Sequence, residues 1–342
     1  MKAETLLYRI NITAQCTTPK YKQLANAILT EIKTKRIHTG DILPSINVLS
    51  THLHISRQTA EKAYRYLKSL RVILPIVGKG FIVHDAVGGK IRVAVVLNRL
   101  TTAKKTMYNT FEREMGDRAQ IDLYIYHGDL ATLRSMLINN ATEYDYVAVF
   151  PGFRDPDNVM EDILRIIPAE KRIILGKYMA EMHDSFASIY ENHEEDIVNA
   201  LEQLTDKLRK YHTIKLIYPD FSDYPRSIIK GFYRYAQEQG FHHSLVESLQ
   251  CEKIEKGTCY IQIAEEDLVE LLDLIVTQGL KLRKDTGVIS YNETPLKKYV
   301  MNGITTISAD FDFLGSSVAK CIIDSVPLHL HVPFGVAVRH SI

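Results

Sequence analysis

The 342-residue sequence has no tryptophan and only four cysteines. Cys16, Cys251, Cys259 and Cys321 are too few and too scattered for a disulfide framework, and none forms the C-x-x-C pair typical of zinc or redox sites. No apolar run approaches the roughly 20 residues that a membrane-spanning helix needs, and the first residues lack the features of a signal peptide. We therefore expect a cytoplasmic protein that has no membrane segment.

Common catalytic signatures are also missing. The sequence has no G-x-S-x-G, H-E-x-x-H or G-x-G-x-x-G motif. The pairs His242-His243 and His329-x-His331 have no third metal ligand at motif spacing. The stretch Gly78-Lys79-Gly80 lacks the spacing and the hydroxyl residue of a Walker loop. We expect no enzymatic activity, no metal and no other cofactor.

An excess of charge of one sign is absent from the whole chain, because 42 Lys+Arg stand against 41 Asp+Glu. The balance changes along the sequence, however: residues 1–85 hold 13 Lys+Arg and 5 Asp+Glu and carry +8, so the rest carries −7. A basic segment of this size is typical of proteins that bind the phosphate backbone, although a merely soluble basic surface would have the same charge. Residues 86–90, with paired glycines, indicate a short flexible linker.

Three helices are predicted in the basic segment. Residues 21–35 have apolar side chains at helical spacing, Ser45 can cap a short second helix, and Ser56 can cap a third. One face of the third helix is apolar, so the polar residues of its first turn point elsewhere. These are Arg57, Gln58 and Thr59. In a helix-turn-helix this turn reaches the major groove, where Arg suits guanine and Gln suits adenine.

A hairpin follows the third helix. Residues 72–77 and 81–83 read as two strands joined by Gly78-Lys79-Gly80, which is the pattern of a basic wing. The charged face of an isolated helix is more often simply solvated. The adjacent hairpin favours a winged helix-turn-helix that binds DNA.

The basic segment carries a characteristic series of residues in a fixed order and spacing. They are Tyr21, Gln23, Ile32, Gly40-Asp41, Leu43-Pro44-Ser45, Leu49, Ser56-Arg57, Thr59, Ala63, Leu67 and Gly78-Lys79-Gly80. Through these residues, a stretch of about 65 residues resembles the winged-helix domain of the GntR family of bacterial transcription regulators. The resemblance implies DNA contacts from Ser45, Asn47, Ser56, Arg57, Gln58, Thr59, Gly78 and Lys79. Asn47 stands where the family usually has an Arg, and Glu61 stands where some members carry a basic residue.

From Lys90 onward, short apolar runs alternate with amphipathic helical patterns, which predicts parallel α/β sheets in two lobes. The predicted helices are 194–210, 224–239 and 267–278. The predicted strands are 91–97, 121–126, 146–150, 172–175, 215–218, 259–263 and 288–290.

Ligands in such folds bind beyond the carboxyl ends of the strands. Each polar residue at these ends, taken alone, is more often a cap or a surface residue. Together they provide the forked donors, amides and carboxylates that hydrogen-bond adjacent sugar hydroxyls, and Tyr and Phe replace Trp as stacking platforms. The candidates are Asn98, Arg99, Tyr108, Phe153, Lys177, Asn192, Arg226, Glu266, Asn292 and Glu293.

The acidic part carries a second series of characteristic segments. They are Arg226 with Gly231-Phe232, Gly279-Leu280, residues 287–293, Thr305-Thr306-Ile307, Asp310, Gly315, Ala319 and residues 338–342. Through these segments it resembles the effector domain of LacI-type repressors, which is itself similar to periplasmic sugar-binding proteins. The resemblance implies that Arg226 and Asn292 bind the effector. Asn292 replaces the usual Asp of the family, and Glu266 sits where an Asn is common.

These observations predict a multidomain chain. Residues 1–85 form an α+β winged helix-turn-helix, 86–90 a linker, and 91–342 a bilobed α/β domain like a periplasmic binding protein. Lobe one is expected at about 91–191 and 293–325, and lobe two at about 192–292 and 326–342.

The expected function is transcription regulation by a homodimer that binds double-stranded operator DNA. We expect a repressor of carbohydrate-utilisation genes, switched by a monosaccharide such as a pentose, hexose or deoxyhexose between the lobes. The alternative is a carbohydrate-binding module whose N-terminal domain contacts another protein.

Overall fold

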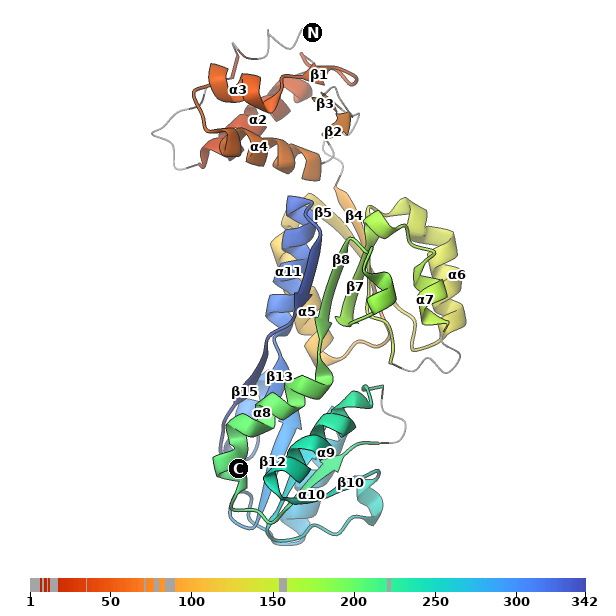
Figure 1. Cartoon of the computed structure of the whole chain (residues 1–342), viewed down its shortest axis with the longest axis vertical. Coiled ribbons are helices and arrows are strands. Elements are labelled where there is room, and N and C mark those ends of the chain that lie inside the picture. Colours follow the sequence, from red (N-terminus) through yellow and green to blue (C-terminus); the bar gives the residue numbers. More distant parts are fainter. Residues whose placement is uncertain are drawn as a thin grey trace.

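The computed structural model describes residues 7, 9–10, 12, 18–34, 36–70, 72–76, 80–83, 90–153, 159–219 and 223–342. Figure 1 shows three parts along the long axis of the molecule, a head followed by two α/β lobes. The multidomain architecture predicted from the sequence is therefore confirmed. Residues 86–89 of the expected linker, and Val77, Gly78 and Lys79 of the expected wing, lie outside the described residues.

The head is a three-helix unit with a small sheet. The helices are α2 (Lys20–Lys33), α3 (Ile46–His52) and α4 (Arg57–Ser69), and the antiparallel strands are β1 (Ile42–Leu43), β2 (Ile73–Ile76) and β3 (Gly80–Val83), in the order β1-β3-β2. The apolar stripes predicted for the helices, including Leu24, Ile28 and Leu67, form one buried core. The helices and the hairpin match the predicted winged helix-turn-helix, whereas β1 is too short to show any periodicity.

The first lobe contains a six-stranded parallel sheet in the order β14-β8-β7-β6-β4-β5. Two separate apolar clusters cover its faces, one under α5 and α11 and the other under α6 and α7. The strands are β4 (Ile91–Leu97), β5 (Ala119–Ile125), β6 (Tyr146–Val149), β7 (Arg172–Lys177), β8 (Ala187–Glu191) and β14 (Leu328–His331). The helices are α5 (Thr102–Met115), α6 (Leu130–Asn140), α7 (Met160–Leu164) and α11 (Phe311–Asp324).

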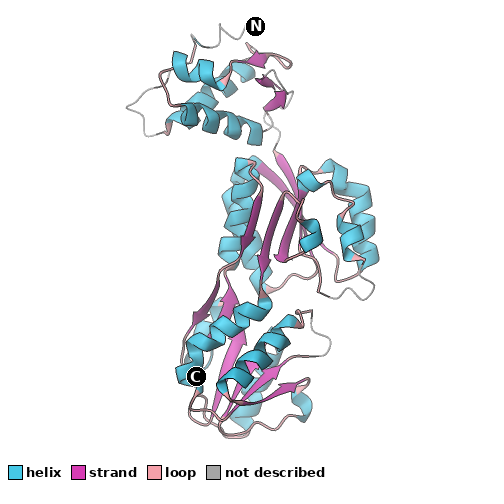
Figure 2. Cartoon of the chain, viewed as in Figure 1, coloured by secondary structure: helices cyan, strands magenta, loops and turns pink. Residues whose placement is uncertain are grey.

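The second lobe has a six-stranded sheet in the order β10-β9-β11-β12-β13-β15, in which only the pairing of β15 is antiparallel. Figure 2 shows the strands of both lobes flanked by helices. The strands are β9 (Thr213–Ile217), β10 (His242–Val246), β11 (Thr258–Gln262), β12 (Thr286–Tyr291), β13 (Thr305–Ala309) and β15 (Phe334–Ala337). The helices α8 (His193–Leu208) and α9 (Ser227–Gln239) cover one face, and α10 (Glu265–Thr277) covers the other.

The chain crosses between the lobes three times, after β8, after β13 and after β14. The first crossing agrees with the expected boundary at residue 191. The other two differ, because β13 pairs with β12 in the second lobe and β14 pairs with β8 in the first. Apolar periodicity predicts that a strand forms, but the neighbour of that strand depends on long-range hydrogen bonds that periodicity does not encode.

Candidate functional site

Each of the two helices in the helix-turn-helix begins with a serine cap, Ser45 for α3 and Ser56 for α4. Ser45 Oγ accepts from the Val48 N–H at 3.3 Å, and Ser56 Oγ accepts from the Thr59 N–H at 3.1 Å. Thr59 Oγ1 lies 2.7 Å from Ser56 Oγ. These side chains satisfy the free N–H groups that begin every helix. The next side chain, Arg57, is exposed in the first turn of α4, as is Gln58.

The inner face of α4 holds the helix against the rest of the head. Tyr64 is buried, its hydroxyl donates to the carbonyl of Pro44 at 2.5 Å, and its ring meets Phe81 of β3 edge to face at 4.9 Å. Burial raises the pKa of Tyr64, so the phenol remains neutral. Tyr64 thus connects α4 both to the turn before α3 and to the wing strand.

Some cationic side chains of the head have an ion-pair partner within the head, and others have none among the described residues. Glu31, 7% exposed, pairs with Arg9 at 3.4 Å and with Arg36 at 3.1 Å. Glu61 and Arg65 are 3.7 Å apart on α4. Arg57 makes no ion pair with any described residue, which leaves its guanidinium available to a phosphate or a base edge.

The structure places the predicted DNA contacts on neighbouring elements. Asn47 is exposed on α3, next to the capping Ser45, and the residues from Ser56 to Thr59 open α4. Gly78 and Lys79 lie outside the described residues. The described members of the set therefore occupy the starts of two consecutive helices, which is the surface that a helix-turn-helix presents to DNA.

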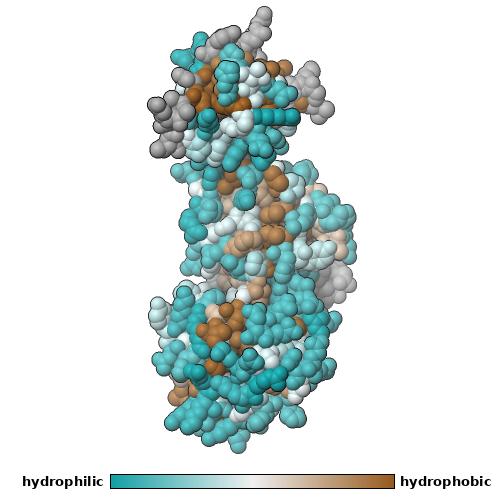
Figure 3. All heavy atoms as spheres, turned by 60° about the vertical axis from the view of Figure 1, so that its left-hand side comes forward, coloured by the Kyte–Doolittle hydropathy of each residue, from teal (hydrophilic) through white to brown (hydrophobic). Residues whose placement is uncertain are grey.

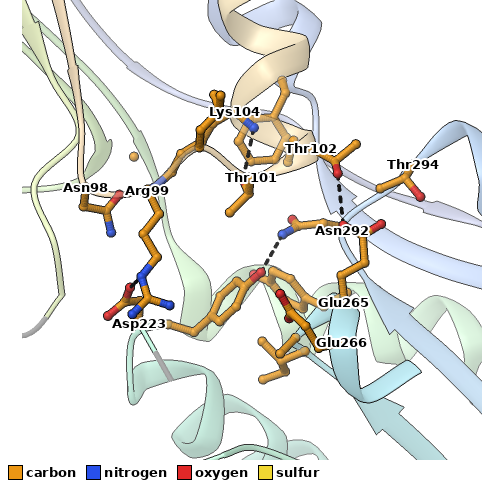
Figure 4. Close-up of a pocket in the computed structure, with 18 of the residues that line it drawn as sticks. Asn98, Arg99, Thr101, Thr102, Lys104, Asp223, Glu265, Glu266, Asn292 and Thr294 are labelled. Carbon is orange, nitrogen blue, oxygen red and sulfur yellow. Dashed lines mark hydrogen bonds and ion pairs between the residues drawn. The ribbon is translucent and has the colours of Figure 1, made fainter. Parts of the chain in front are cut away.

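A cavity of about 560 Å³ lies between the two lobes. It is bounded by the carboxyl ends of parallel strands, where the sequence predicted a ligand site. The first lobe contributes residues 98–104, Phe150, Phe153, Gly176, Glu191 and Phe311, and the second contributes His193, Pro219, Asp223, Tyr224, residues 263–267, Tyr291, Asn292, Thr294 and Lys297. Figure 4 shows polar side chains from both lobes converging on this space.

The cavity brings together half of the predicted effector residues. Asn98, Arg99, Phe153, Glu266 and Asn292 line it, whereas Tyr108, Lys177, Asn192, Arg226 and Glu293 do not.

Each residue outside the lining has a definite place. Tyr108 packs against the apolar core of the first lobe from the middle of α5. Asn192 and Arg226 are exposed at the starts of α8 and α9, and Lys177 is half-buried at the end of β7. Glu293 accepts from Thr306 and pairs with Arg339 at 2.8 Å. Asn292 follows the end of β12 with a positive φ of 63°, and of these two neighbours only Asn292 lines the cavity.

Two polar contacts join the lobes across the cavity. Arg99 Nε lies 2.6 Å from Asp223 Oδ2, and Thr102 Oγ1 donates to Glu265 Oε2 at 3.0 Å. Both contacts are drawn in Figure 4. Within the second lobe, Asn292 Nδ2 donates to the Tyr224 hydroxyl at 3.2 Å. A ligand that enters between the walls therefore meets side chains that already link the lobes.

Three titratable groups lie deep in the cavity wall. Burial, reinforced by Asp196, raises the pKa of Glu191 to about 8. Burial also lowers the pKa of Lys104 to about 8 and that of His193 to about 4. Lys104 donates to Asn98 Oδ1, and its Nζ lies 5.0 Å from the centre of the Phe150 ring. His193 meets Phe153 edge to face at 5.1 Å.

The sequence-based set missed Lys104, Glu191, His193, Asp223 and Glu265. Glu191 and His193 flank the end of β8, a strand that the sequence pattern did not reveal. Lys104 lies in the first turn of α5, where its main-chain N–H donates to the Thr101 cap. The spacing of three residues from this cap was the only feature of the sequence that could have pointed to Lys104. Glu265 is the immediate neighbour of the predicted Glu266 on α10.

Several buried polar atoms of lining residues have no hydrogen-bond partner in the described part of the chain. They are His193 Nε2, Asp267 Oδ2, Asn292 Oδ1 and Thr294 Oγ1. Buried polar groups are nearly always paired, so such atoms indicate partners supplied by a ligand or by water.

The described ranges contain no group of three or more His, Cys, Asp or Glu side chains arranged to hold a metal ion. His331 instead lies 3.0 Å from Asp196. Among the same residues, no helix is long and apolar enough to cross a membrane.

Comparison with solved structures shows the fold of the two lobes. The trehalose repressor from Escherichia coli superposes with a TM-score of 0.62 at 14% identity, over 73% of this chain and 100% of that one. A lac repressor dimer bound to operator and the anti-inducer ONPF gives 0.60 at 16% identity, over 74% and 94%. The lac repressor bound to ONPG in the repressed state gives 0.62 at 16% identity, over 84% and 90%.

The sequence of the head matches a known family. No curated protein matches the chain, but residues 20–83 match the model of the bacterial regulatory proteins of the gntR family. The match spans α2 to β3 and includes both capping serines. The chain is thus a transcriptional regulator, in which a helix-turn-helix domain of the gntR family precedes a body with the fold of the trehalose and lac repressors.

Proposed function

We propose that this regulator represses carbohydrate-utilisation genes and that a monosaccharide bound between the lobes switches its affinity for operator DNA. The observation that carries the proposal is the cavity of about 560 Å³, whose walls come from both lobes and touch through Arg99–Asp223 and Thr102–Glu265. A ligand held by both walls changes the balance between open and closed arrangements of the lobes. Such coupling between two sites is typically worth about 1–3 kcal/mol.

The chemistry of the walls suits a sugar. Arg99 offers a forked donor, Asn98 and Asn292 offer amides, and Glu265 and Glu266 offer carboxylates for adjacent hydroxyls. Phe150, Phe153 and Tyr224 provide aromatic surface for the apolar face of a sugar ring. This combination of a few polar groups with aromatic surface is typical of small-molecule sites.

A route from the cavity to the head runs along α11. This helix begins at Phe311, which lines the cavity, and it contacts α4 of the head. Figure 1 shows α11 extending along the first lobe towards α4. A shift of the lobes can therefore reach the helix that carries Arg57 without passing through the linker.

Regulators of this kind act as symmetric pairs, because one helix-turn-helix covers only a half-site. We propose a homodimer that binds a pseudo-palindromic operator. Exposed apolar side chains are present on the body, among them Ile138, Tyr178, Leu296 and Tyr299. On the face drawn in Figure 3, hydrophobic residues reach the surface in several patches surrounded by hydrophilic ones. Surface of this kind is a candidate for self-association.

Thermal shift with a panel of pentoses, hexoses and deoxyhexoses tests the ligand site. We expect one sugar to raise the melting temperature, and Asn292→Ala to abolish this rise, whereas Asn199→Ala on the exposed face of α8 should keep it. The same sugars, tested on the Arg226→Ala and Arg99→Ala variants, show which arginine binds the ligand. Loss of the shift in Arg226→Ala but not in Arg99→Ala would place the ligand outside the cavity described above.

A mobility shift with DNA from upstream of the gene separates this function from a carbohydrate-binding module with a protein-interaction head. We expect a complex that weakens with salt and dissociates when the stabilising sugar is added. A chain that binds the sugar but no DNA would support the alternative.

A further inference from the structure

The wall that the second lobe contributes to the cavity is strongly acidic. It carries Asp223, Glu265, Glu266 and Asp267, against a single lysine, Lys297. The last three carboxylates form the first turn of α10. Figure 4 shows Glu265 and Glu266 next to each other, and Asp223 apart from them beside Arg99.

The cations near this wall already have partners, and only Arg99 pairs with one of the wall carboxylates. Arg99 pairs with Asp223 at 2.6 Å. Lys297 Nζ donates to the main-chain carbonyls of Tyr291 and Asn292, at 3.1 Å and 2.7 Å. Lys104 donates to Asn98 across the cavity floor. Within the described chain, the carboxylates of Glu266 and Asp267 have no ion-pair partner. Glu265 accepts from the Thr102 hydroxyl, and its charge partly offsets the lowering of the Lys297 pKa by burial.

Acidic residues in the first turn stabilise a helix through its dipole, and this explains why α10 begins with them. The dipole does not supply a counter-charge on the cavity side of the carboxylates. Burial, with added repulsion from Glu266 and Glu270, raises the pKa of Asp267 to about 6. The wall thus carries negative charge that a positively charged group of a ligand could neutralise.

Independent of charge, several buried polar atoms of the cavity wall have no hydrogen-bond partner among the described residues. Thr294, 3% exposed, and His193, 8% exposed, are lining residues whose Oγ1 and Nε2 atoms have no partner among the described residues. The same is true of Asn292 Oδ1 and Asp267 Oδ2. Asn292 Oδ1 and the ionised Asp267 carboxylate can only accept a hydrogen bond, whereas the Thr294 hydroxyl and the His193 ring can accept or donate, so a ligand with several N–H and O–H groups can satisfy all four. An ammonium group supplies three donors together with the missing charge.

We propose that the effector is a polyhydroxylated primary amine, such as an amino sugar with a free amino group, whose ammonium lies against Glu266 and Asp267. The proposal rests on the proposed function, since it names the charge of the sugar that the cavity binds. The hydroxyls of the ligand face Asn98, Arg99 and Thr102 on the opposite wall. Anionic sugars, including phosphorylated ones, meet the acidic wall and are excluded by repulsion.

Matched sugar pairs test this proposal in thermal-shift titrations of the full chain at neutral pH and low salt. The pairs are glucosamine with glucose, galactosamine with galactose and mannosamine with mannose, each with the N-acetylated form. We expect one free amine to act at a concentration about tenfold lower than its neutral partners, because charge-assisted hydrogen bonds are the stronger ones. Equal action of the neutral or acetylated sugar overturns the proposal and leaves the sugar-sensing function standing, whereas no shift with any sugar overturns both.

Two substitutions identify the groups that select the charge. Glu266→Gln and Asp267→Asn should each reduce the preference for the amine towards that for the neutral sugar. Asp273→Asn is the matched control, because Asp273 is exposed on the same helix and lies outside the cavity lining. A preference that persists in both cavity variants, with unchanged melting temperatures of the free proteins, overturns the assignment.

Discussion

Glu191 is a carboxyl group that the fold buries in the cavity wall, where its ionised form is unfavourable. It is buried, its Oε2 lies 3.7 Å from His193 Nδ1, and Lys104 and Asp196 act on it from nearby. Burial outweighs the attraction of the lysine, so the pKa of Glu191 rises from 4.5 to about 8. The folded state keeps its proton over a range where the unfolded chain has lost it. Stability from this group is complete below about pH 4.5 and is lost as pH rises through about 8.

Glu191→Gln, which imitates the protonated acid, should remove this pH dependence. We expect the variant to melt at the same temperature as the wild type near pH 4.5 and a few degrees higher near pH 8. His193 responds in the opposite range, because its pKa is lowered to about 4 by burial, so both proteins should lose stability in acid. Melting curves across pH measure the difference, and a constant offset at all pH values would contradict the raised pKa.

Arg57 is the residue for which we predict the most direct contact with DNA. It is exposed in the first turn of α4, and the Ser56 cap and the buried Tyr64 fix the helix that carries it. Replacement by Ala should cost about 1–3 kcal/mol on one operator sequence and relax the preference at one base pair. The control is Lys207→Ala, which removes an exposed cation at the end of α8. Fluorescence anisotropy with single-base operator variants would refute the role if both variants lost affinity equally for every sequence.

Among the elements, the close contact of α5 and α11 depends on a missing side chain. A Cβ added at Gly315 of α11 would lie 2.4 Å from the Met107 carbonyl oxygen and 3.1 Å from the Phe111 nitrogen, both main-chain atoms of α5. These two helices cover one face of the first sheet and both begin at the cavity, with Thr102 and Phe311. Any separation of the helices therefore alters the cavity as well as the core.

Gly315→Ala should lower the free energy of unfolding by about 1–3 kcal/mol, because backbone atoms cannot yield as a flexible side chain does. Gly335→Ala on β15 is the control, since a Cβ there meets nothing within 4 Å. Urea denaturation of both variants measures the difference. Equal midpoints for the two would show that α5 and α11 separate without cost.

Elements with a strong local signal could be predicted from sequence. The caps at Ser45 and Ser56 and the apolar run of β4 predicted three element boundaries correctly. The strands β8, β10, β13, β14 and β15 were not predicted. In β8 and β14, for example, the short alternating patterns contain polar residues such as Ser188 and His329. The same limit applies to the residues that line the cavity. Asn98, which follows the predicted strand β4, was among the candidates, whereas Glu191, at the end of the unpredicted β8, was not.

At the scale of the whole molecule, the balanced charge conceals two opposed parts. The basic head approaches DNA, and the body, with a net charge of −7, is repelled by phosphate. Only about 64 residues match the family of the head, and the body shares 14–16% identity with the repressors it resembles. The fold is retained at this distance because it depends on apolar periodicity, whereas the ligand depends on a few side chains that periodicity leaves free.

The central claim, that a sugar in the cavity controls a DNA-reading head, is tested most directly by titrating the intact chain onto its upstream DNA with and without the sugar that stabilises it. We predict salt-dependent, sequence-specific binding that the sugar weakens by about 5–150-fold, the range expected for coupling between sites. We also predict that Asn292→Ala binds the DNA normally but no longer responds to the sugar. An unchanged DNA affinity at saturating sugar, in a wild-type chain that binds both, would contradict the claim.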